Sequence, residues 1–337
     1  MTGKNGPLHL ILISIHGLIR GHDLELGVDD DTGGQTRYVV ELARTLGERD
    51  DVARVDLLTR RILASAVSSD YARREERLSD KVSIVRLDCG EEGYITKEQL
   101  WDSLDTFADN ALSYIRERQL APDIIHSHYA DAGYVGVRLS SLLGIPLVHT
   151  GHSLGRVKRQ RLLASGLKRD EIERQYNISR RIEVEEDVLG AADLVITSTR
   201  QEIEEQYGLY NHYQPERMKV VPPGTALEQF YPPDGTEQGS AMQRELARFL
   251  KQPDKPVILA MSRPDARKNL GTLLDVYGES AALQRAANLV IIAGTREDIR
   301  DMGSRPQEVL TDLLLSIDQY DLYGRVAYPK HHQSGDV

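Results

Sequence analysis

Gly33 and Gly34 are the first residues of this sequence whose type and position could support binding chemistry. They follow the almost continuously apolar run 8–15 and a long loop, and they precede a segment with apolar side chains at helical spacing through Leu46. The first turn of a helix presents unpaired N–H groups, and glycine lets a ligand approach the backbone closely. The pair is either an anion-binding helix start or only a tight turn into the helix, and the long loop favours binding.

Polar side chains gather after two successive apolar segments, 123–126 and 146–148, which we predict to be strands. Ligands of open α/β sheets lie beyond the carboxyl ends of the strands. A single histidine at such a position is usually a structural hydrogen bonder, but here histidines recur, which favours at least one functional histidine. The side chains are His126, His128, Tyr129 and Asp131 after the first strand, and His149 and His152 after the second.

Residues 152–169 contain six basic side chains and no acidic one, although the whole chain has a formal net charge of −10. These cations either form a solvated surface or bind an anionic ligand such as a phosphate. Arg180 and Arg181 follow among acidic neighbours, which on their own indicate salt-bridging surface residues. The residues alone therefore leave the role of the basic segment open and assign no binding role to the two arginines.

The elements that must position these residues follow from alternating apolar and amphipathic segments, the pattern of a βα-repeating protein with parallel sheets. The length of 337 residues predicts two domains, and the irregular segment 228–242 places their boundary, giving domains 1–235 and 236–337. Three predicted strands in the second domain are few for a parallel α/β domain, so we expect it to be incomplete. We predict strands at 8–15, 55–58, 82–87, 123–126, 146–148, 194–197, 219–221, 257–261, 288–293 and 326–328. We predict helices from Gly34 to Leu46 and at 97–118, 170–189, 270–277 and 308–317, with an exposed charged segment at 68–81.

Composition excludes several classes of protein. The acidic balance argues against a general nucleic-acid or membrane-surface binder. The single cysteine, Cys89, cannot form a disulfide within the chain, and the first apolar run is too short to span a membrane. We therefore expect a cytoplasmic protein. The run Asp29-Asp30-Asp31 could bind magnesium, but acidic residues are also favoured just before a helix, and we expect no metal site.

Taken together, several motifs resemble those of the sucrose-phosphate synthases, within family 4 of the retaining glycosyltransferases. They are HGLIRGHDLELGVDDDTGGQTRYVVELA, HSHYADAGYVG, HTGHSLGR, SRRIEVEE, ADLVITSTRQEI, VVPPG and SRPDARKNL. The resemblance implies a GT-B architecture, in which two Rossmann-like domains face each other across a cleft. The first domain would bind mainly the acceptor and the second mainly the nucleotide sugar. The implied reaction transfers glucose from UDP-glucose to fructose 6-phosphate, giving sucrose 6-phosphate and UDP.

The same resemblance implies roles for individual residues. It places Gly33, Gly34 and Gln35 where the sugar phosphate and the donor diphosphate meet, and His152 against the transferred glucose. Arg263 and Lys268 would hold the diphosphate and stabilise the charge on the leaving UDP. The implied acceptor site comprises Gly33, Gln35, Lys97, Tyr129, Asp131, Lys158, Arg180 and Arg181. The cations among them decide between the two interpretations of the basic segment, because only a phosphorylated acceptor requires them.

The resemblance also implies what is not needed and what is missing. Retention in this family is attributed to displacement on one face, with the leaving phosphate oxygen accepting the proton, so no carboxylate nucleophile is required. The GT-B architecture also implies no essential metal site, and we expect no cofactor. The family's E-x7-E donor segment is absent, so we expect this chain to transfer glucose weakly or not at all. The alternatives are a related transferase with another nucleotide sugar, such as a mannosyl donor, or a non-catalytic fructose-6-phosphate-binding fragment or subunit. A sucrose-phosphate phosphatase would be a partner.

Overall fold

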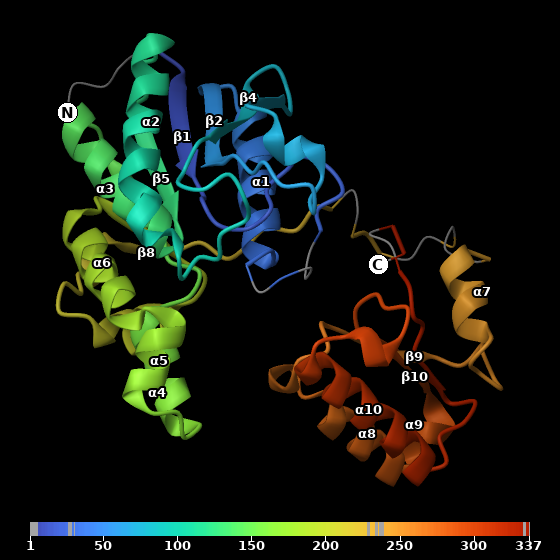
Figure 1. The fold of residues 1–337 in the computed structure, drawn as a ribbon. Coiled ribbons are helices and arrows are strands. Elements are labelled where there is room, and N and C mark those ends of the chain that lie inside the picture. Colours follow the sequence, from blue (N-terminus) through green and yellow to red (C-terminus); the bar gives the residue numbers. More distant parts are fainter. Residues whose placement is uncertain are drawn as a thin grey trace. The chain divides into compact units, whose positions relative to one another are not determined.

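A computed structural model describes residues 6–25, 29, 31–227, 230–232, 235, 239–332 and 335–336. The chain divides into two compact units, Met1–Gly224 and Thr225–Val337 (Figure 1). The sequence placed the boundary between residues 235 and 236, and residue 236 lies outside the described residues.

Unit 1 contains an eight-stranded sheet in the order β3-β4-β2-β1-β5-β6-β7-β8. All neighbouring strands are parallel except β3 and β4. The strands are β1 Leu8–Ile13, β2 Val52–Arg60, β3 Glu75–Arg77, β4 Val82–Leu87, β5 Ile124–His128, β6 Leu147–Thr150, β7 Leu194–Thr197 and β8 Met218–Val220. The helices are α1 Gly34–Gly47, α2 Leu104–Glu117, α3 Tyr129–Leu143, α4 Gly155–Ala164, α5 Arg169–Tyr176 and α6 Ile178–Ala191.

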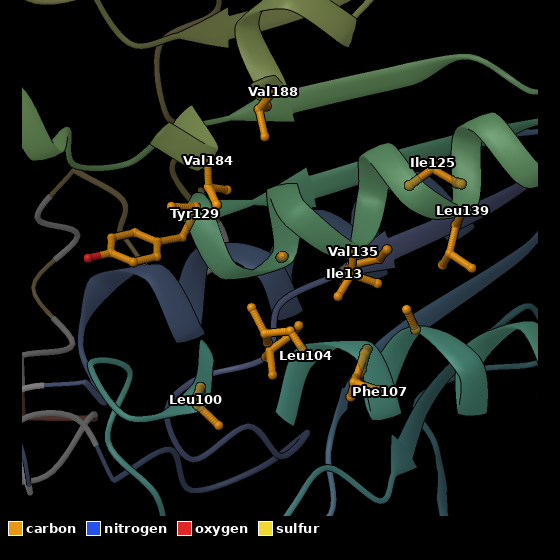
Figure 2. Packing of buried hydrophobic residues seen from close by; sticks show 14 of the residues in the cluster. Ile13, Leu100, Leu104, Phe107, Ile125, Tyr129, Val135, Leu139, Val184 and Val188 are labelled. Atoms are coloured by element: carbon orange, nitrogen blue, oxygen red, sulfur yellow. The ribbon is translucent and has the colours of Figure 1, made fainter. Parts of the chain in front are cut away.

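The central strand β1 is covered on both faces, as its continuous apolar run requires. Its Leu12 belongs to a cluster with Val39 and Ala43 of α1 on one face. Its Ile13 belongs to the larger cluster on the other face, which includes Phe107 of α2 and residues of α3 and α6 (Figure 2). The centre of the sheet is therefore packed on both faces, and this packing fixes the positions of the residues at the strand ends.

Two predicted helices differ from the observed ones. The predicted helix 97–118 is wrong at its start, because the 3₁₀ turn Leu100–Ser103 precedes α2 and Lys97 lies before that turn. The predicted helix 170–189 is two helices, because Asn177 adopts a left-handed conformation with φ of 45° between α5 and α6. The segment 68–81 is not only an exposed connection, since it contains β3, which pairs antiparallel with β4.

Unit 2 contains a three-stranded parallel sheet in the order β11-β10-β9. One face packs against α8 and α10 in one apolar cluster, and Leu246, Phe249 and Leu250 pack against the other face of β10 and β11. The apolar side chains of Val257 and Leu259 on β9 are exposed. The elements are α7 Ala241–Ala247, β9 Val257–Met261, α8 Leu270–Glu279, α9 Ala281–Ala286, β10 Asn288–Ile292, α10 Ser304–Gln319 and β11 Val326–Ala327.

Within the described part of the chain, none of the helices has both the length and the apolar character needed to cross a bilayer.

Candidate functional site

The candidate site in unit 1 begins at the point where the strand order reverses. The chain runs from β1 to β2 and β4 on one side and returns to β5 on the other side of β1. In doubly wound sheets, the carboxyl ends of the strands at such a switch point form the ligand crevice. A hydrogen bond of 2.7 Å between His16 Nδ1 and Asp131 Oδ2 joins the segments that follow β1 and β5. Both side chains are buried, so this contact fixes the base of the site.

Tyr129 lies at the centre of this region. Its backbone is held at φ of 76°, in the left-handed region that non-glycine residues rarely adopt. The ring contacts His16 edge-on with centroids 4.6 Å apart, and the guanidinium carbon of Arg181 lies 4.4 Å from the ring centroid. In Figure 2 its hydroxyl points away from the apolar cluster into which the ring packs. An unusual backbone at a strand end that aims a polar tip outward is typical of functional positions.

A small pocket opens beside Tyr129, with a cavity volume of about 10 Å³, which is about the room that one water molecule needs. We call it the cationic pocket, because three of the side chains that line it carry positive charge. It is lined by Lys97, Glu98, Trp101, Tyr129, Lys158, Tyr176 and Arg181. Four of these seven residues, Lys97, Tyr129, Lys158 and Arg181, were predicted from the sequence as site residues. Only the resemblance to the family predicted that they belong to one site. Glu98, Trp101 and Tyr176 were missed; Glu98 adjoins Lys97 in sequence, but no signal pointed to the two aromatic residues.

Lys158 of α4 is surrounded by aromatic and acidic groups. Its ammonium lies 3.7 Å from the ring centroid of Tyr176 and 3.7 Å from Glu98 Oε1. Burial lowers the pKa of Lys158 to about 8; Glu98 opposes this shift, and the neighbouring cations Arg181 and Lys97 contribute to it. An ammonium with this environment gains from an anion placed in the pocket, because the anion would compensate the lost hydration.

Lys97 is held by the buried carboxylate of Asp31. Its ammonium pairs with one carboxylate oxygen, and its backbone N–H donates to the other at 2.9 Å. Burial alone would raise the pKa of Asp31, but Lys97 outweighs it and the net pKa lies below the ordinary value. Glu98 Oε1 also lies 3.5 Å from the Lys97 ammonium, so one carboxylate bridges Lys97 and Lys158.

The two adjacent arginines of α6 have different environments. Arg181 is buried; it donates to Glu185 at 2.8 Å and to the carbonyl oxygen of Ser153 at 2.6 Å. Arg180 is 42% exposed, donates to Asp102 at 2.6 Å, and is not among the residues that line the cationic pocket. Only Arg181 of this pair therefore faces the pocket directly.

The glycine pair begins α1, as predicted. Gly33 precedes the helix and Gly34 is its first residue, with no acidic side chain in the first turn and no side-chain cap. A Cβ atom at either position would meet no atom within 4 Å. Gln35 donates to Ser14 Oγ at 3.3 Å across the same segment. The first turn of α1 thus opens into free space, which suits an anion.

Histidines of β5 and of the segment that follows β6 form a row. His128 Nδ1 and His152 Nε2 are 3.1 Å apart, and the ring of His126 lies 4.2 Å from that of His128. Tyr38 of α1 contacts His152 edge-on, with centroids 5.1 Å apart. His152 has φ of 56°, and its pKa lies below the ordinary value because partial loss of hydration around its ring and the nearby histidines disfavour the charged form. These histidines are therefore neutral at neutral pH and can act as hydrogen-bonding groups without charge.

The acidic run before α1 has other partners. Asp29 Oδ1 accepts from the N–H groups of Asp31 and Thr32 at 2.7 and 2.5 Å, and Asp31 binds Lys97. Asp30 lies outside the described residues. Within the described ranges, no group of three or more His, Cys, Asp or Glu side chains is arranged to hold a metal ion.

In unit 2, Arg263 follows the carboxyl end of β9, and Lys268 ends the short 3₁₀ helix Ala266–Lys268 just before α8. Both side chains are exposed. Asp265 caps this turn by accepting from the backbone N–H of Arg267 at 3.0 Å. The role predicted for Arg263 and Lys268, binding the donor diphosphate, stays a prediction.

Solved structures give the class of the fold. The sucrose-phosphate synthase from Thermosynechococcus elongatus matches with a TM-score of 0.68 and 25% identity, over 97% of this chain and 71% of that one. HepE of Anabaena, in complex with UDP, matches with a TM-score of 0.59 and 12% identity, over 98% of this chain and 71% of that one, and supports the fold alone. The α/β fold with parallel sheets is that of the GT-B glycosyltransferases, as predicted.

The chain belongs to the glycosyl transferase 4-like family, whose model matches residues 33–224. It is 43% identical to a probable sucrose-phosphate synthase of Arabidopsis thaliana over an alignment of 390 residues, and 43% identical to one of Vicia faba over 396 residues. Each alignment covers 99% of this chain and 37% of the relative, so the chain spans little more than a third of their length. The predicted resemblance is confirmed.

Proposed function

We propose that this chain carries the acceptor site of a retaining glucosyltransferase that transfers glucose from UDP-glucose to fructose 6-phosphate, giving sucrose 6-phosphate and UDP. The observation that carries the proposal is the cationic pocket, in which Lys97, Lys158 and Arg181 converge beside Tyr129. Three cations around one small opening fit a phosphate, whose charge-assisted hydrogen bonds would compensate their desolvation. Unphosphorylated fructose would leave these cations with only their carboxylate partners Asp31, Glu98 and Glu185.

The proposed roles of the other residues follow from where they lie. The open first turn of α1 offers the N–H groups of Gly34 and Gln35 to the phosphate groups that meet there. Neutral His152 contacts the transferred glucose through an uncharged hydrogen bond. Arg263 and Lys268 hold the donor diphosphate and stabilise the charge that develops on the departing UDP.

The reaction requires no carboxylate nucleophile in this proposal. The acceptor hydroxyl attacks the anomeric carbon on the face from which UDP leaves, and a phosphate oxygen of UDP takes the proton. The protein supplies orientation and electrostatic stabilisation, which account for a large share of the rate enhancement in such transfers. Neither a metal ion nor another cofactor takes part, and a phosphatase that hydrolyses sucrose 6-phosphate is the proposed partner.

Calorimetry on the purified chain tests the proposal, using fructose 6-phosphate, fructose and UDP as separate ligands. We expect fructose 6-phosphate to bind at least about tenfold more tightly than fructose, because only the phosphate pairs with the pocket cations. Equal affinity for the two sugars would refute a phosphorylated acceptor. A panel of nucleotide sugars then distinguishes UDP-glucose from another donor.

A second candidate is binding of the sugar phosphate without transfer. All seven residues that line the cationic pocket belong to unit 1, so unit 1 alone supplies the residues proposed to bind the sugar phosphate. Binding of fructose 6-phosphate without binding of UDP, and without turnover when UDP-glucose is added, would support this candidate over the enzyme.

A further inference from the structure

Asp31, in the acidic run before α1, contacts Lys97, one of the residues that line the cationic pocket. The residue is 7% exposed, and its carboxylate accepts from the Lys97 ammonium, the Lys97 backbone N–H at 2.9 Å and the Tyr94 hydroxyl at 3.2 Å. These donors come from a segment more than sixty residues further along the chain. One carboxylate thus fixes both the backbone and the charged end of Lys97.

Hydrogen bonds hold the backbone of the segment that contains Asp31, both before and after this residue. Asp29 Oδ1 accepts from the backbone N–H of Asp31, and Thr32 Oγ1 accepts from the backbone N–H of Leu18 at 3.0 Å. Two residues after Asp31, Gly33 leads into the first turn of α1. Asp31 is therefore a rigid connection between the open helix start and the lysine at the pocket.

We infer that Asp31 is a positioning residue, which holds the Lys97 ammonium beside the pocket so that an incoming sugar phosphate meets an already ordered cation. A free lysine side chain has many rotamers and would lose this freedom on binding, which weakens affinity. Asp31 removes that cost in advance. The inference rests on the proposed function, because it assumes that Lys97 binds the acceptor phosphate.

Two other roles for Asp31 predict different results. If the carboxylate only stabilised the loop, its removal would weaken the fold without changing the preference for a phosphorylated sugar. If it mainly neutralised Lys97, its removal would free a positive charge and strengthen phosphate binding. If Asp31 positions Lys97, removal of the carboxylate should instead weaken binding, and only of ligands that carry a phosphate.

The test is a double-mutant cycle of Asp31→Asn and Lys97→Met, with affinities for fructose 6-phosphate and fructose measured by calorimetry. We expect Asp31→Asn to weaken fructose 6-phosphate binding about tenfold in the original chain and less than about twofold when Lys97 is already methionine, because the two changes then remove the same interaction. Binding of fructose should not change. Additive effects, or tighter binding by Asp31→Asn, would overturn the inference.

Asp56→Asn is the matched control. Asp56 is also a fully buried carboxylate of unit 1 and accepts from His9 and Arg54 side chains, but it does not line the pocket. Asp56→Asn should lower the stability of the fold without changing the ratio of the affinities for fructose 6-phosphate and fructose. If Asp31→Asn does not fold, Asp31→Glu keeps the charge while shifting it by one methylene, and it should still weaken fructose 6-phosphate binding; unchanged affinity would overturn the inference.

The two proposals fail in distinguishable ways. If the unaltered chain binds both sugars equally, the proposed acceptor is wrong whatever the variants show. If the unaltered chain prefers fructose 6-phosphate and Asp31→Asn retains that preference, only the role of Asp31 is wrong.

Discussion

Lys158 is the residue whose charge state matters most at the cationic pocket. Its pKa of about 8 results first from burial, opposed by Glu98 and reinforced by Arg181 and Lys97. A dianionic phosphate would favour the charged form, so binding should be tightest where Lys158 is already protonated. The pocket therefore links affinity for a sugar phosphate to pH.

We predict that the affinity for fructose 6-phosphate falls as the pH rises through about 8, because the ammonium must then take up a proton on binding. The affinity approaches a slope of about tenfold per pH unit above that pKa. Calorimetry between pH 6.5 and 9.5 measures it. Lys158→Arg keeps its charge throughout this range and should remove the fall; a flat profile in the unaltered chain would contradict the prediction.

The neighbouring arginines should differ sharply in their effect on stability. Arg181→Met leaves the buried Glu185 without its cation, which costs about 3–5 kcal/mol of unfolding free energy. Arg180→Met loses an exposed pair with Asp102, a 3.3 Å hydrogen bond to the Trp101 carbonyl oxygen and a contact with the Trp101 ring, and it should cost only about 1 kcal/mol. Urea unfolding of both variants compares them. Glu185→Gln should recover part of the loss in Arg181→Met, and equal costs for the two arginines would be inconsistent with the structure.

At the scale of elements, the start of α1 offers a clean test of anion binding. A Cβ atom at Gly34 meets open space, so Gly34→Ala should leave stability unchanged or raise it by up to about 1 kcal/mol. The same methyl group would occupy the space through which a ligand approaches the backbone. We predict at least a tenfold loss of affinity for fructose 6-phosphate or UDP, measured by calorimetry, at undiminished thermal stability. Unchanged affinity for both would mean that the glycine pair is only a turn.

The sequence predicted strands better than helix limits, for physical reasons. The runs 82–87, 194–197 and 257–261 match β4, β7 and β9 because short apolar runs have a clear start and end in the sequence, even where the strand, like β9, has exposed apolar side chains. The helix predicted from residue 97 failed because Lys97 is bound to Asp31, a distant contact that no local pattern reveals. The break at Asn177 depends on a left-handed conformation that asparagine tolerates but does not dictate.

The candidate site was only partly predictable. Residues at strand ends, such as Tyr129 and Asp131, follow from the general position of ligands in α/β sheets. Lys97, Lys158 and Arg181 come from separate segments, and only the resemblance joined them before the fold was known. Glu98 and Tyr176 acquire a role only because the fold brings them to Lys158, so spacing in the sequence could not identify them.

At the scale of the molecule, the buried histidines make unit 1 sensitive to acid. Burial lowers the pKa of His126 to about 4 and of His149 to about 3, and that of His128 also lies well below its ordinary value. Unfolded histidine titrates near pH 6.5, so below that pH the unfolded chain takes up protons that the folded chain does not. Stability is fully present above about pH 6.5 and is lost as the pH falls toward 4.

We predict that the urea midpoint of unit 1 decreases steadily between pH 7 and pH 5. Trp101 is the only tryptophan and is buried in unit 1, so its fluorescence follows this unit alone. Each neutral histidine contributes up to about 1.4 kcal/mol per pH unit. His149→Gln keeps a hydrogen-bonding partner for Ser127 and should flatten the slope, whereas a midpoint that rises on acidification would contradict the account.

The proposed function depends on where the phosphate of the acceptor binds, and a crystal structure with fructose 6-phosphate measures this directly. We expect phosphate oxygens within hydrogen-bonding distance of the Lys97 and Lys158 ammonium groups, with the sugar beside Tyr129 and directed toward the first turn of α1. A phosphate bound elsewhere on unit 1, or a sugar whose phosphate faces solvent and contacts neither lysine, would contradict the proposed function.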